Sequence, residues 1–144
     1  MTVTPTADHN GHIEVRVDAK AWMLPFVRTM AAEVAARADF DLDAVADLRM
    51  AVDEACATLL GDAVEDGQLC CGFAVDRDRI QVQVTVPPRR PGARFDTTGF
   101  GWQVLRTLVD EIVTLPVEAT DATGPPEGAG AVLGVRFVKK ALVP

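Results

Sequence analysis

The stretch Leu48-Arg49-Met50-Ala51-Val52-Asp53-Glu54-Ala55-Cys56-Ala57-Thr58 lies near the middle of the chain and predicts an amphipathic helix. Apolar side chains in and around it recur at the spacing of one helix face, at Val45, Leu48, Val52, Ala55 and Leu59. Asp41 suits the N-cap of this helix, and Gly61 suits its end. We therefore expect one long helix whose apolar face lies in the core.

The opposite face of this helix carries polar side chains. A turn of about 100° per residue places Glu54 and Thr58 about 200° and 240° away from Val52. Because the two residues are four positions apart, they share a face and can contact one ligand. A solvated helix face that carries Asp47, Glu54 and Thr58 would show the same pattern, and spacing alone favours that simpler interpretation.

A second stretch, Thr98-Gly99-Phe100-Gly101-Trp102-Gln103-Val104-Leu105-Arg106-Thr107-Leu108-Val109-Asp110-Glu111, predicts a helix from about Gly99 to Ile112. Its expected core residues are Trp102, Leu105, Leu108 and Val109. The glycines at 99 and 101 either permit a tight turn into the helix or let backbone N–H groups at its positive end face an anion. By itself the glycine pattern favours the first possibility.

Short strands are predicted on both sides of these helices. Ile13, Val15 and Val17 alternate with polar residues, and segments 69–75 and 80–86 predict a hairpin. Another helix is expected to begin near Leu24. From Pro87 to Thr97, prolines and glycine predict a loop of the length that lids often have. Strands at 113–117 and 132–138 follow, joined by a glycine- and proline-rich link at 119–130.

The order of these elements, β-α-α-β-β-α-β-β, predicts the fold class. It favours an α/β (α+β) two-layer sandwich, with helices on one face of a mixed, mostly antiparallel sheet. Residues 1–11 show no periodicity and are expected to be a disordered tail. With 144 residues in total, the remaining range 12–144 suits a single domain.

Charge and composition exclude several classes of partner. The formal net charge is -7, and Lys20, Lys139 and Lys140 are the only lysines, so a nucleic-acid duplex or an anionic membrane is not expected to bind. Three cysteines without CxxC spacing indicate buried thiols in a reducing compartment. The chain has neither a long apolar run nor a signal peptide, which predicts a cytoplasmic protein.

Together the two quoted stretches resemble the helices that frame the nucleotide pocket of small GHKL-type ATPases, in particular the anti-sigma factor and serine-protein kinase family of RsbW and SpoIIAB. The resemblance runs from Ile13 to Lys140 and implies the Bergerat fold of those ATPases. It also implies ATP and Mg²⁺ as cofactors. By this resemblance Glu54 is the catalytic base that acts on a serine of a partner protein.

Thr58 stands where the family has an asparagine that binds Mg²⁺. By resemblance Thr58 is therefore the metal ligand, and we expect it to bind the ion more weakly, because a hydroxyl is shorter than an amide and Mg²⁺ demands close octahedral geometry. Thr98, Gly99 and Gly101 resemble the end of the family's lid, which holds the ATP phosphates.

The second strand of the hairpin leads to a departure from the family pattern. The family has Asp-x-Gly-x-Gly here, with an aspartate that bonds adenine. This chain reads Val84-Thr85-Val86-Pro87-Pro88-Arg89-Arg90-Pro91-Gly92, and it has no acidic residue between Asp78 and Asp96. We therefore expect weak ATP binding.

Phe26-Val27-Arg28 matches a Phe-x-Arg whose arginine binds protein partners in the family. The resemblance implies that Arg28 contacts an alternative sigma factor of the stress-response type and, alternately, an anti-anti-sigma protein with a STAS fold. It also implies a homodimer. The sequence thus predicts an anti-sigma factor whose kinase activity is weak or lost.

Two alternatives stay open. One is an active protein-serine kinase that binds ATP through rearranged contacts, for example with Asp96. The other is a regulatory dimerisation or ligand-binding module unrelated to sigma factors. A zinc hydrolase or a Ser/His/Asp hydrolase is not expected, because the chain has only two histidines.

Overall fold

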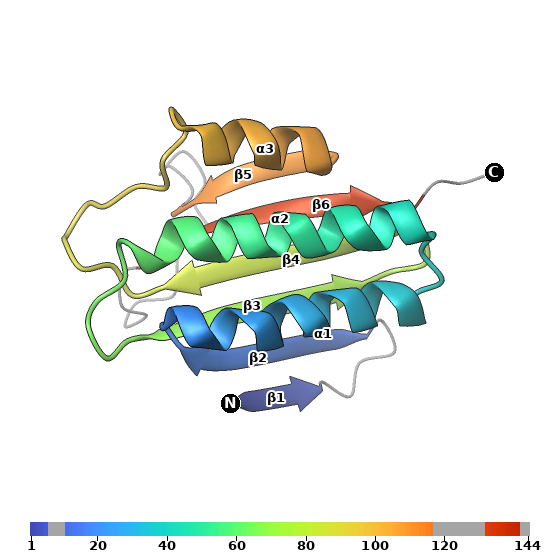
Figure 1. Cartoon of the computed structure of the whole chain (residues 1–144), viewed down its shortest axis with the longest axis horizontal. Coiled ribbons are helices and arrows are strands. Elements are labelled where there is room, and N and C mark those ends of the chain that lie inside the picture. The colour runs from blue at the N-terminus through green and yellow to red at the C-terminus, as the bar shows by residue number, and fades with distance from the viewer. Residues whose placement is uncertain (6–10, 117–131, 142–144) are drawn as a thin grey trace, which may run out of the picture.

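The computed structural model describes residues 1–5, 11–116 and 132–141, and in these ranges three α-helices cover one face of a six-stranded sheet (Figure 1). The strands are β1 (Thr2–Pro5), β2 (His12–Asp18), β3 (Gln68–Val75), β4 (Arg79–Val86), β5 (Glu111–Leu115) and β6 (Leu133–Lys140). The helices are α1 (Leu24–Arg37), α2 (Leu42–Leu60) and α3 (Phe100–Leu108), and a short 3₁₀ turn, η1 (Ala21–Met23), precedes α1. No helix in the described part of the chain is long and apolar enough to cross a membrane.

The sheet has the order β1-β2-β3-β4-β6-β5, and every neighbouring pair is antiparallel. The expectation of a mixed sheet is therefore wrong, while the two layers and the one-sided placement of the helices are confirmed (Figure 1). The reason lies in β6. A single helix, α3, connects β4 to β5, so these two strands run in the same direction, but β6 lies between them and is antiparallel to both.

The long helix α2 begins and ends where the sequence predicts. The Asp41 carboxylate accepts a hydrogen bond from the Ala44 amide at 2.7 Å, and Gly61 is the C-cap. An N-cap of this kind satisfies one of the backbone donors that a helix start leaves unpaired. The predicted start of α1 near Leu24 is also confirmed, with Pro25 in its first turn.

The third helix is shorter than predicted. It ends at Leu108, and β5 begins at Glu111. The chain leaves the helix here because the Asp110 amide donates to the carbonyl of Val138 in β6 at 2.8 Å, which commits the following residues to the sheet. Of the predicted core residues in this segment only Leu105 is buried, whereas Trp102, Leu108 and Val109 are half-buried.

The predicted disordered tail is wrong for residues 2–5. These residues form β1, which pairs with β2 from Thr2 opposite Arg16 to Pro5 opposite Ile13. Backbone groups on the free edge of β2 offer hydrogen bonds to any extended segment, so an edge strand forms here without an apolar pattern of its own. The predicted link at 119–130 lies outside the described residues.

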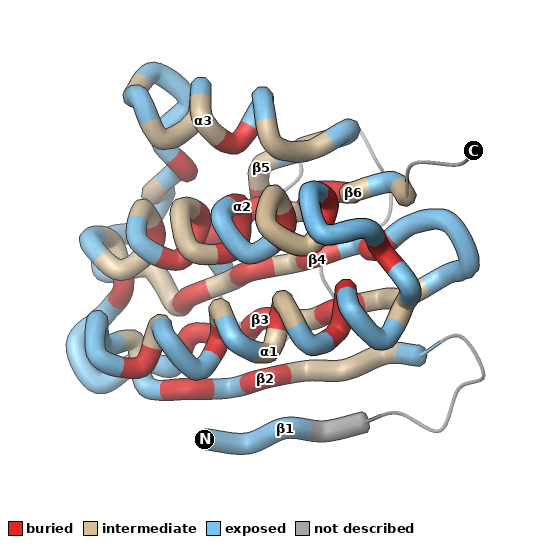
Figure 2. The backbone as a smooth tube through the Cα atoms, turned by 45° about the vertical axis from the view of Figure 1, so that its right-hand side comes forward, coloured by how far each residue is buried: buried red, intermediate tan, exposed pale blue. Residues whose placement is uncertain are grey.

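The core lies between the helices and the sheet. Figure 2 shows the buried residues on the inner sides of α1 and α2 and along β2, β3, β4 and β6. The alternation of Val82, Val84 and Val86 with polar residues places these valines on the helix-covered face, where they are buried. The core thus holds α2 firmly, and α2 carries the candidate site.

Candidate functional site

Helix α2 lies between α1 and α3 (Figure 1). Its apolar face packs on the sheet with Leu48, Val52 and Ala55 fully buried. Its other faces therefore point to solvent and to the neighbouring helices. Glu54 and Thr58 are half-buried on the side of α2 that meets α3.

The first turn of α3 brings the predicted residues Glu54, Thr58 and Gly101 together. A Cβ atom added to Gly101 would collide with Glu54 Oε1 and would lie 3.2 Å from Thr58 Oγ1. Glu54 and Thr58 thus both face the first turn of α3, and their contact with one ligand stays a prediction. Glycine at 101 is what permits this close approach of the two helices.

The carboxylate of Glu54 has no hydrogen bond or ion pair within the described part of the chain. It is therefore available to an external ligand. A carboxylate beside a hydroxyl also offers two oxygen ligands of the type that Mg²⁺ prefers. Among the described residues, however, no three His, Cys, Asp or Glu side chains gather into a metal site.

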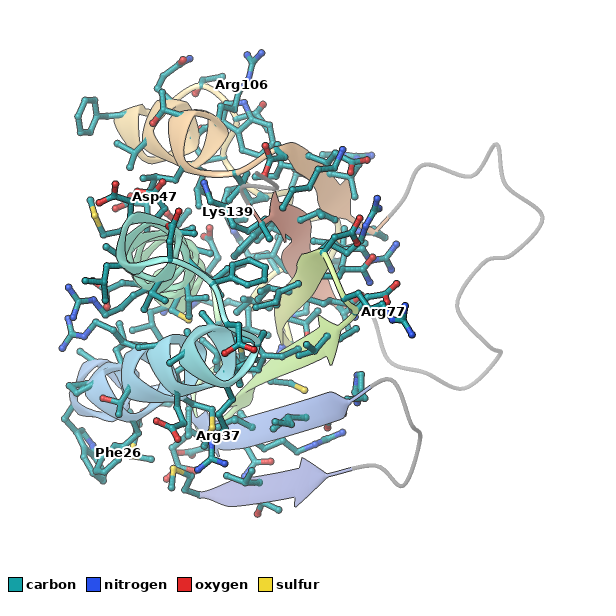
Figure 3. All side chains as sticks on the ribbon, turned by 90° about the vertical axis from the view of Figure 1, so that its right-hand side faces the viewer. Phe26, Arg37, Asp47, Arg77, Arg106 and Lys139 are labelled. Atoms are coloured by element: carbon teal, nitrogen blue, oxygen red, sulfur yellow. The ribbon has the colours of Figure 1, made fainter. Side chains whose placement is uncertain are left out.

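Lys139 connects β6 to both α2 and α3. Its Nζ donates to Asp47 Oδ2 at 3.1 Å and to the Leu108 carbonyl at 2.9 Å, and its side chain is only 15% exposed (Figure 3). A partly buried cation that bonds the last carbonyls of a helix stabilises that helix end. Lys139 thus fixes the position of α3 next to α2.

Sequence reasoning missed this lysine, although a signal was present. The alternation of buried residues Leu133, Val135 and Phe137 continues to Lys139, which places a cation on the helix-covered face of the sheet. A lysine at such a position needs an acidic or carbonyl partner. On the predicted solvated face, the Asp47 side chain is 39% exposed and also binds Lys139.

The segment before α3 is held by its own side chains. Asp96 Oδ1 accepts hydrogen bonds from the amide and the hydroxyl of Thr98, both at 2.8 Å. Gly99 is the N-cap of α3, and a Cβ on it would lie 2.8 Å from Asp96 Oδ2. The donors of Thr98, which the resemblance assigns to a phosphate, therefore already have a carboxylate acceptor.

We predict that this turn responds to acid. The Thr98 amide, and then its hydroxyl, hold the pKa of Asp96 below its ordinary value of 3.8. Because its pKa is lowered in the folded state, the ionised Asp96 carboxylate contributes fully to stability above its ordinary pKa. This contribution is lost as the pH falls through the lowered pKa of the folded state. We expect the amide resonance of Thr98 to shift in step with protonation of Asp96 in an NMR titration. Asp96→Asn is expected to abolish that shift, and a Thr98 resonance that ignores pH in the wild-type protein would contradict the assignment.

Arg28 lies on the outer side of the helix pair α1 and α2. Its Nη1 is 3.4 Å from Asp53 Oδ1, and the two side chains are 41% and 40% exposed. Arg28 is thus exposed enough to pair with an acid. An exposed pair of this kind contributes about 0–1 kcal/mol, so an acidic group of another protein can replace Asp53 at little cost.

The loop after β4 differs from a nucleotide-binding loop in its backbone. Pro87 and Pro88 have no N–H to donate, and the Pro87 carbonyl accepts from the Val64 amide at 2.9 Å. The Arg89 amide donates to the Asp62 carbonyl at 2.7 Å. The Pro87 carbonyl and the Arg89 amide are therefore committed to the chain itself, and neither proline can donate a backbone hydrogen bond to ATP.

Two hollows lie away from Glu54, Thr58 and Gly101. One, of about 410 Å³, is beside the end of α3 and the start of β5, and one, of about 150 Å³, is on the helix-free face of the sheet. The residues lining the first are Trp102, Arg106, Val109, Asp110, Glu111 and Ile112. Neither hollow includes a residue that the sequence assigns to cofactor binding.

Comparison with known proteins identifies relatives over most of the chain. The chain is 32% identical over 133 residues to the anti-sigma-F factor RsbW of Mycobacterium tuberculosis. This alignment covers 89% of this chain and 73% of that protein. The chain is also 27% identical over 119 residues to the serine-protein kinase RsbW of Bacillus cereus. That alignment covers 69% of this chain and 74% of the kinase. No family model matches the sequence.

Proposed function

The chain belongs to the RsbW family of anti-sigma factors and serine-protein kinases, and from this premise we propose that it binds and sequesters an alternative sigma factor of the stress-response type in the cytoplasm. An anti-anti-sigma protein with a STAS fold releases the sigma factor, and the anti-sigma factor acts as a homodimer. The identity of 32% to an anti-sigma-F factor over 89% of the chain is the observation that carries this proposal.

Arg28 is the partner-binding residue in this proposal. Its exposure and its weak pairing with Asp53 support the role, because an arginine that is only loosely held can turn to an acidic group on an incoming protein. Phe26 lies two residues earlier in α1 and is also exposed. An arginine beside an exposed aromatic residue is typical of protein interfaces.

The kinase activity is weak or lost in this proposal. Three observations support that part. Thr58 stands in place of the metal-binding asparagine, the loop after β4 has no acid for adenine, and the first turn of α3 lies directly on Glu54 and Thr58. The first turn of α3 thus lies beside the two side chains that the resemblance assigns to catalysis and metal binding.

An active serine-protein kinase is the second candidate. The observation in its favour is the meeting of Glu54, Thr58 and Gly101, since a free carboxylate near a helix start is a suitable arrangement for a base and a phosphate site. Asp96 is less suited to bind ATP, because it already accepts two hydrogen bonds from Thr98. A regulatory module unrelated to sigma factors is not favoured by any contact in the described residues.

The test is partner binding by the purified protein. We expect the protein to form a complex with an alternative sigma factor from its own organism without added ATP, and a cognate STAS protein to dissociate that complex. Arg28→Glu is expected to weaken sigma-factor binding about tenfold, because it places an acid beside Asp53 and removes a cation from the interface. Calorimetry or surface plasmon resonance measures both effects.

Arg37→Glu is the matched control for this variant. Arg37 lies at the other end of α1 and also makes an exposed ion pair, with Glu33. We expect this control to bind both partners as the wild-type protein does. If none of the organism's alternative sigma factors binds, the proposed function is wrong; if Arg28→Glu binds both partners normally, only the role of Arg28 is wrong.

A further inference from the structure

The loop between β4 and α3 concentrates positive charge on an acidic protein. Arg89, Arg90 and Arg94 lie within residues 87–94, which we call the arginine loop, and the loop contains no acidic residue. The whole chain carries a formal net charge of -7. A local cluster of this sign therefore stands out against the charge of the rest of the protein.

The arginine loop is held in place by the protein. Its first residues attach to the segment after α2 through the bridge between Ala63 and Pro88 and the bond from the Arg89 amide to the Asp62 carbonyl. Just past its last residue, Phe95 is buried and packs against Trp102 with ring centroids 5.9 Å apart. Both ends are thus anchored, so little conformational entropy is lost when the loop binds a partner.

The arginine side chains at the start of the loop point outward. Arg89 and Arg90 are exposed and form no ion pair within the part of the chain that the structure describes. Asp62, Glu65 and Asp66 lie in the adjacent segment, but their carboxylates do not bind these two arginines. The guanidinium groups are therefore available to an external acid.

Exposed aromatic side chains are also present at the end of the molecule that carries the arginine loop. The chain has eight aromatic residues, six Phe and two Trp, and three of them are well exposed, with Trp22 at 67%, Phe26 at 49% and Phe100 at 83%. Trp22 and Phe26 lie in η1 and the start of α1, and Phe100 lies at the start of α3 on the other side of α2; all are at the end where the arginine loop joins β4 to α3 (Figure 1). Arginine and aromatic residues are the types most enriched at the centres of protein interfaces.

We propose that the arginine loop is a docking site for an acidic polypeptide segment of a protein partner. This inference rests on the proposed function in one respect: the partner belongs to the set that an anti-sigma factor binds. Arg89 and Arg90 supply the charge, and the aromatic residues at this end supply apolar contact area.

A nucleic acid is a poorer occupant than an acidic protein segment. Nucleic-acid affinity depends on neutralising many phosphates, and a duplex would bring its remaining charge close to a protein of net charge -7. A short acidic segment needs only two or three cations. Its encounter with the loop is steered by local charge and weakens with salt.

The experiment uses the full chain with poly-L-glutamate as the acidic probe and, in parallel, with the alternative sigma factor that binds the wild-type protein. At low salt we expect saturable binding of poly-L-glutamate, weakened about tenfold in Arg89→Glu/Arg90→Glu and less in each single variant. We expect the sigma factor or its STAS antagonist to lose affinity in the same variants. Fluorescence anisotropy measures the first, and calorimetry the second.

Arg77→Glu is the matched control for each single variant. Arg77 is exposed and has no ion pair in the described residues, and it lies in the turn between β3 and β4, at the end of the sheet opposite the arginine loop (Figure 1). Arg77→Glu changes the net charge by the same amount as Arg89→Glu or Arg90→Glu, and we expect it to leave the affinity for poly-L-glutamate unchanged. Circular dichroism is expected to show that all variants keep the fold, since none of the three side chains is buried.

Several results would overturn the inference. These are a wild-type protein that does not bind poly-L-glutamate, an Arg89→Glu/Arg90→Glu variant that binds it normally, and an Arg77→Glu control that loses as much affinity. Tighter binding of a 20-nucleotide single-stranded DNA or of tripolyphosphate, lost in the same variants, would assign the loop to a phosphate ligand instead. If the wild-type protein binds poly-L-glutamate through the loop but binds no sigma factor, the proposed function fails and the docking site stands.

Discussion

Gly134→Ala is expected to lower the free energy of unfolding by about 3 kcal/mol, at the upper end of the usual cost of overpacking. Gly134 lies in β6 between β4 and β5 and is fully buried. A Cβ at this position would collide with the Val84 carbonyl oxygen and would lie 3.1 Å from the Cα of Thr85. Both atoms belong to the backbone of β4, so the clash cannot be relieved by turning a side chain.

The expected loss is large because β6 is a central strand. It pairs with β4 along its whole length and also carries β5, so a shift of its backbone disturbs two strand pairs. The stability of a domain of this size is typically only about 5–15 kcal/mol in total. Chemical denaturation in urea, with the midpoint and the slope both fitted, measures the difference.

Gly72→Ala is the matched control for Gly134→Ala. Gly72 lies in β3 on the same helix-free face of the sheet, and a Cβ there would be 3.6 Å from His12 Nε2, which is ordinary van der Waals contact. We expect its stability to stay within about 0.5 kcal/mol of the wild-type value. Equal stability of the two variants would mean that β6 can move away from β4 without cost, contrary to the packing.

Local patterns predicted the elements of this fold well. The limits of α2 followed from Asp41 and Gly61, because a cap acts on its own helix within a few residues. The sheet order did not follow, because β6 enters between β4 and β5 from a distant part of the sequence. The restriction on Gly134 was likewise invisible, since it depends on which backbone atom of β4 lies opposite.

The sequence predicted which residues of the candidate site share a face of α2, but not which residues of other elements contact that face. Helical periodicity placed Glu54 and Thr58 on one face of α2, and the structure confirms this. It could not show that Gly101 of α3 fills the space in front of them, because that contact joins residues more than 40 positions apart. The role of Lys139 stayed hidden for the same reason, since its partners belong to α2 and α3.

ATP is expected to bind this protein about a hundredfold more weakly than it binds the serine-protein kinase RsbW of Bacillus cereus, measured side by side by calorimetry with Mg²⁺. A hydrogen bond from a base to a carboxylate contributes about 1.5–3 kcal/mol, and this chain has no carboxylate between Asp78 and Asp96 to make it. Each 1.4 kcal/mol corresponds to a factor of ten in affinity. The Pro87 carbonyl and the Arg89 amide are already bonded within the chain, so neither is free to replace that contact.

Two substitutions on α2 separate the causes of weak binding. Thr58→Asn adds a metal-binding amide but leaves adenine without its partner, so we expect it to raise the affinity for Mg-ATP less than tenfold. Ala57→Asn, on the exposed side of the same helix, is the control and is expected to change nothing. Glu54→Ala removes the carboxylate that faces Gly101, and we expect it to leave any residual ATP affinity intact while abolishing any residual phosphorylation of a STAS partner.

The outcome decides between the two proposed mechanisms of release. Wild-type affinity comparable to that of the Bacillus cereus kinase, with serine phosphorylation that Glu54→Ala abolishes, would establish the active kinase. Absence of binding at millimolar ATP would leave the exchange of sigma factor and antagonist to competition at the protein surface. In that case Arg28 and the arginine loop, and not a phosphorylated serine, determine which partner is held.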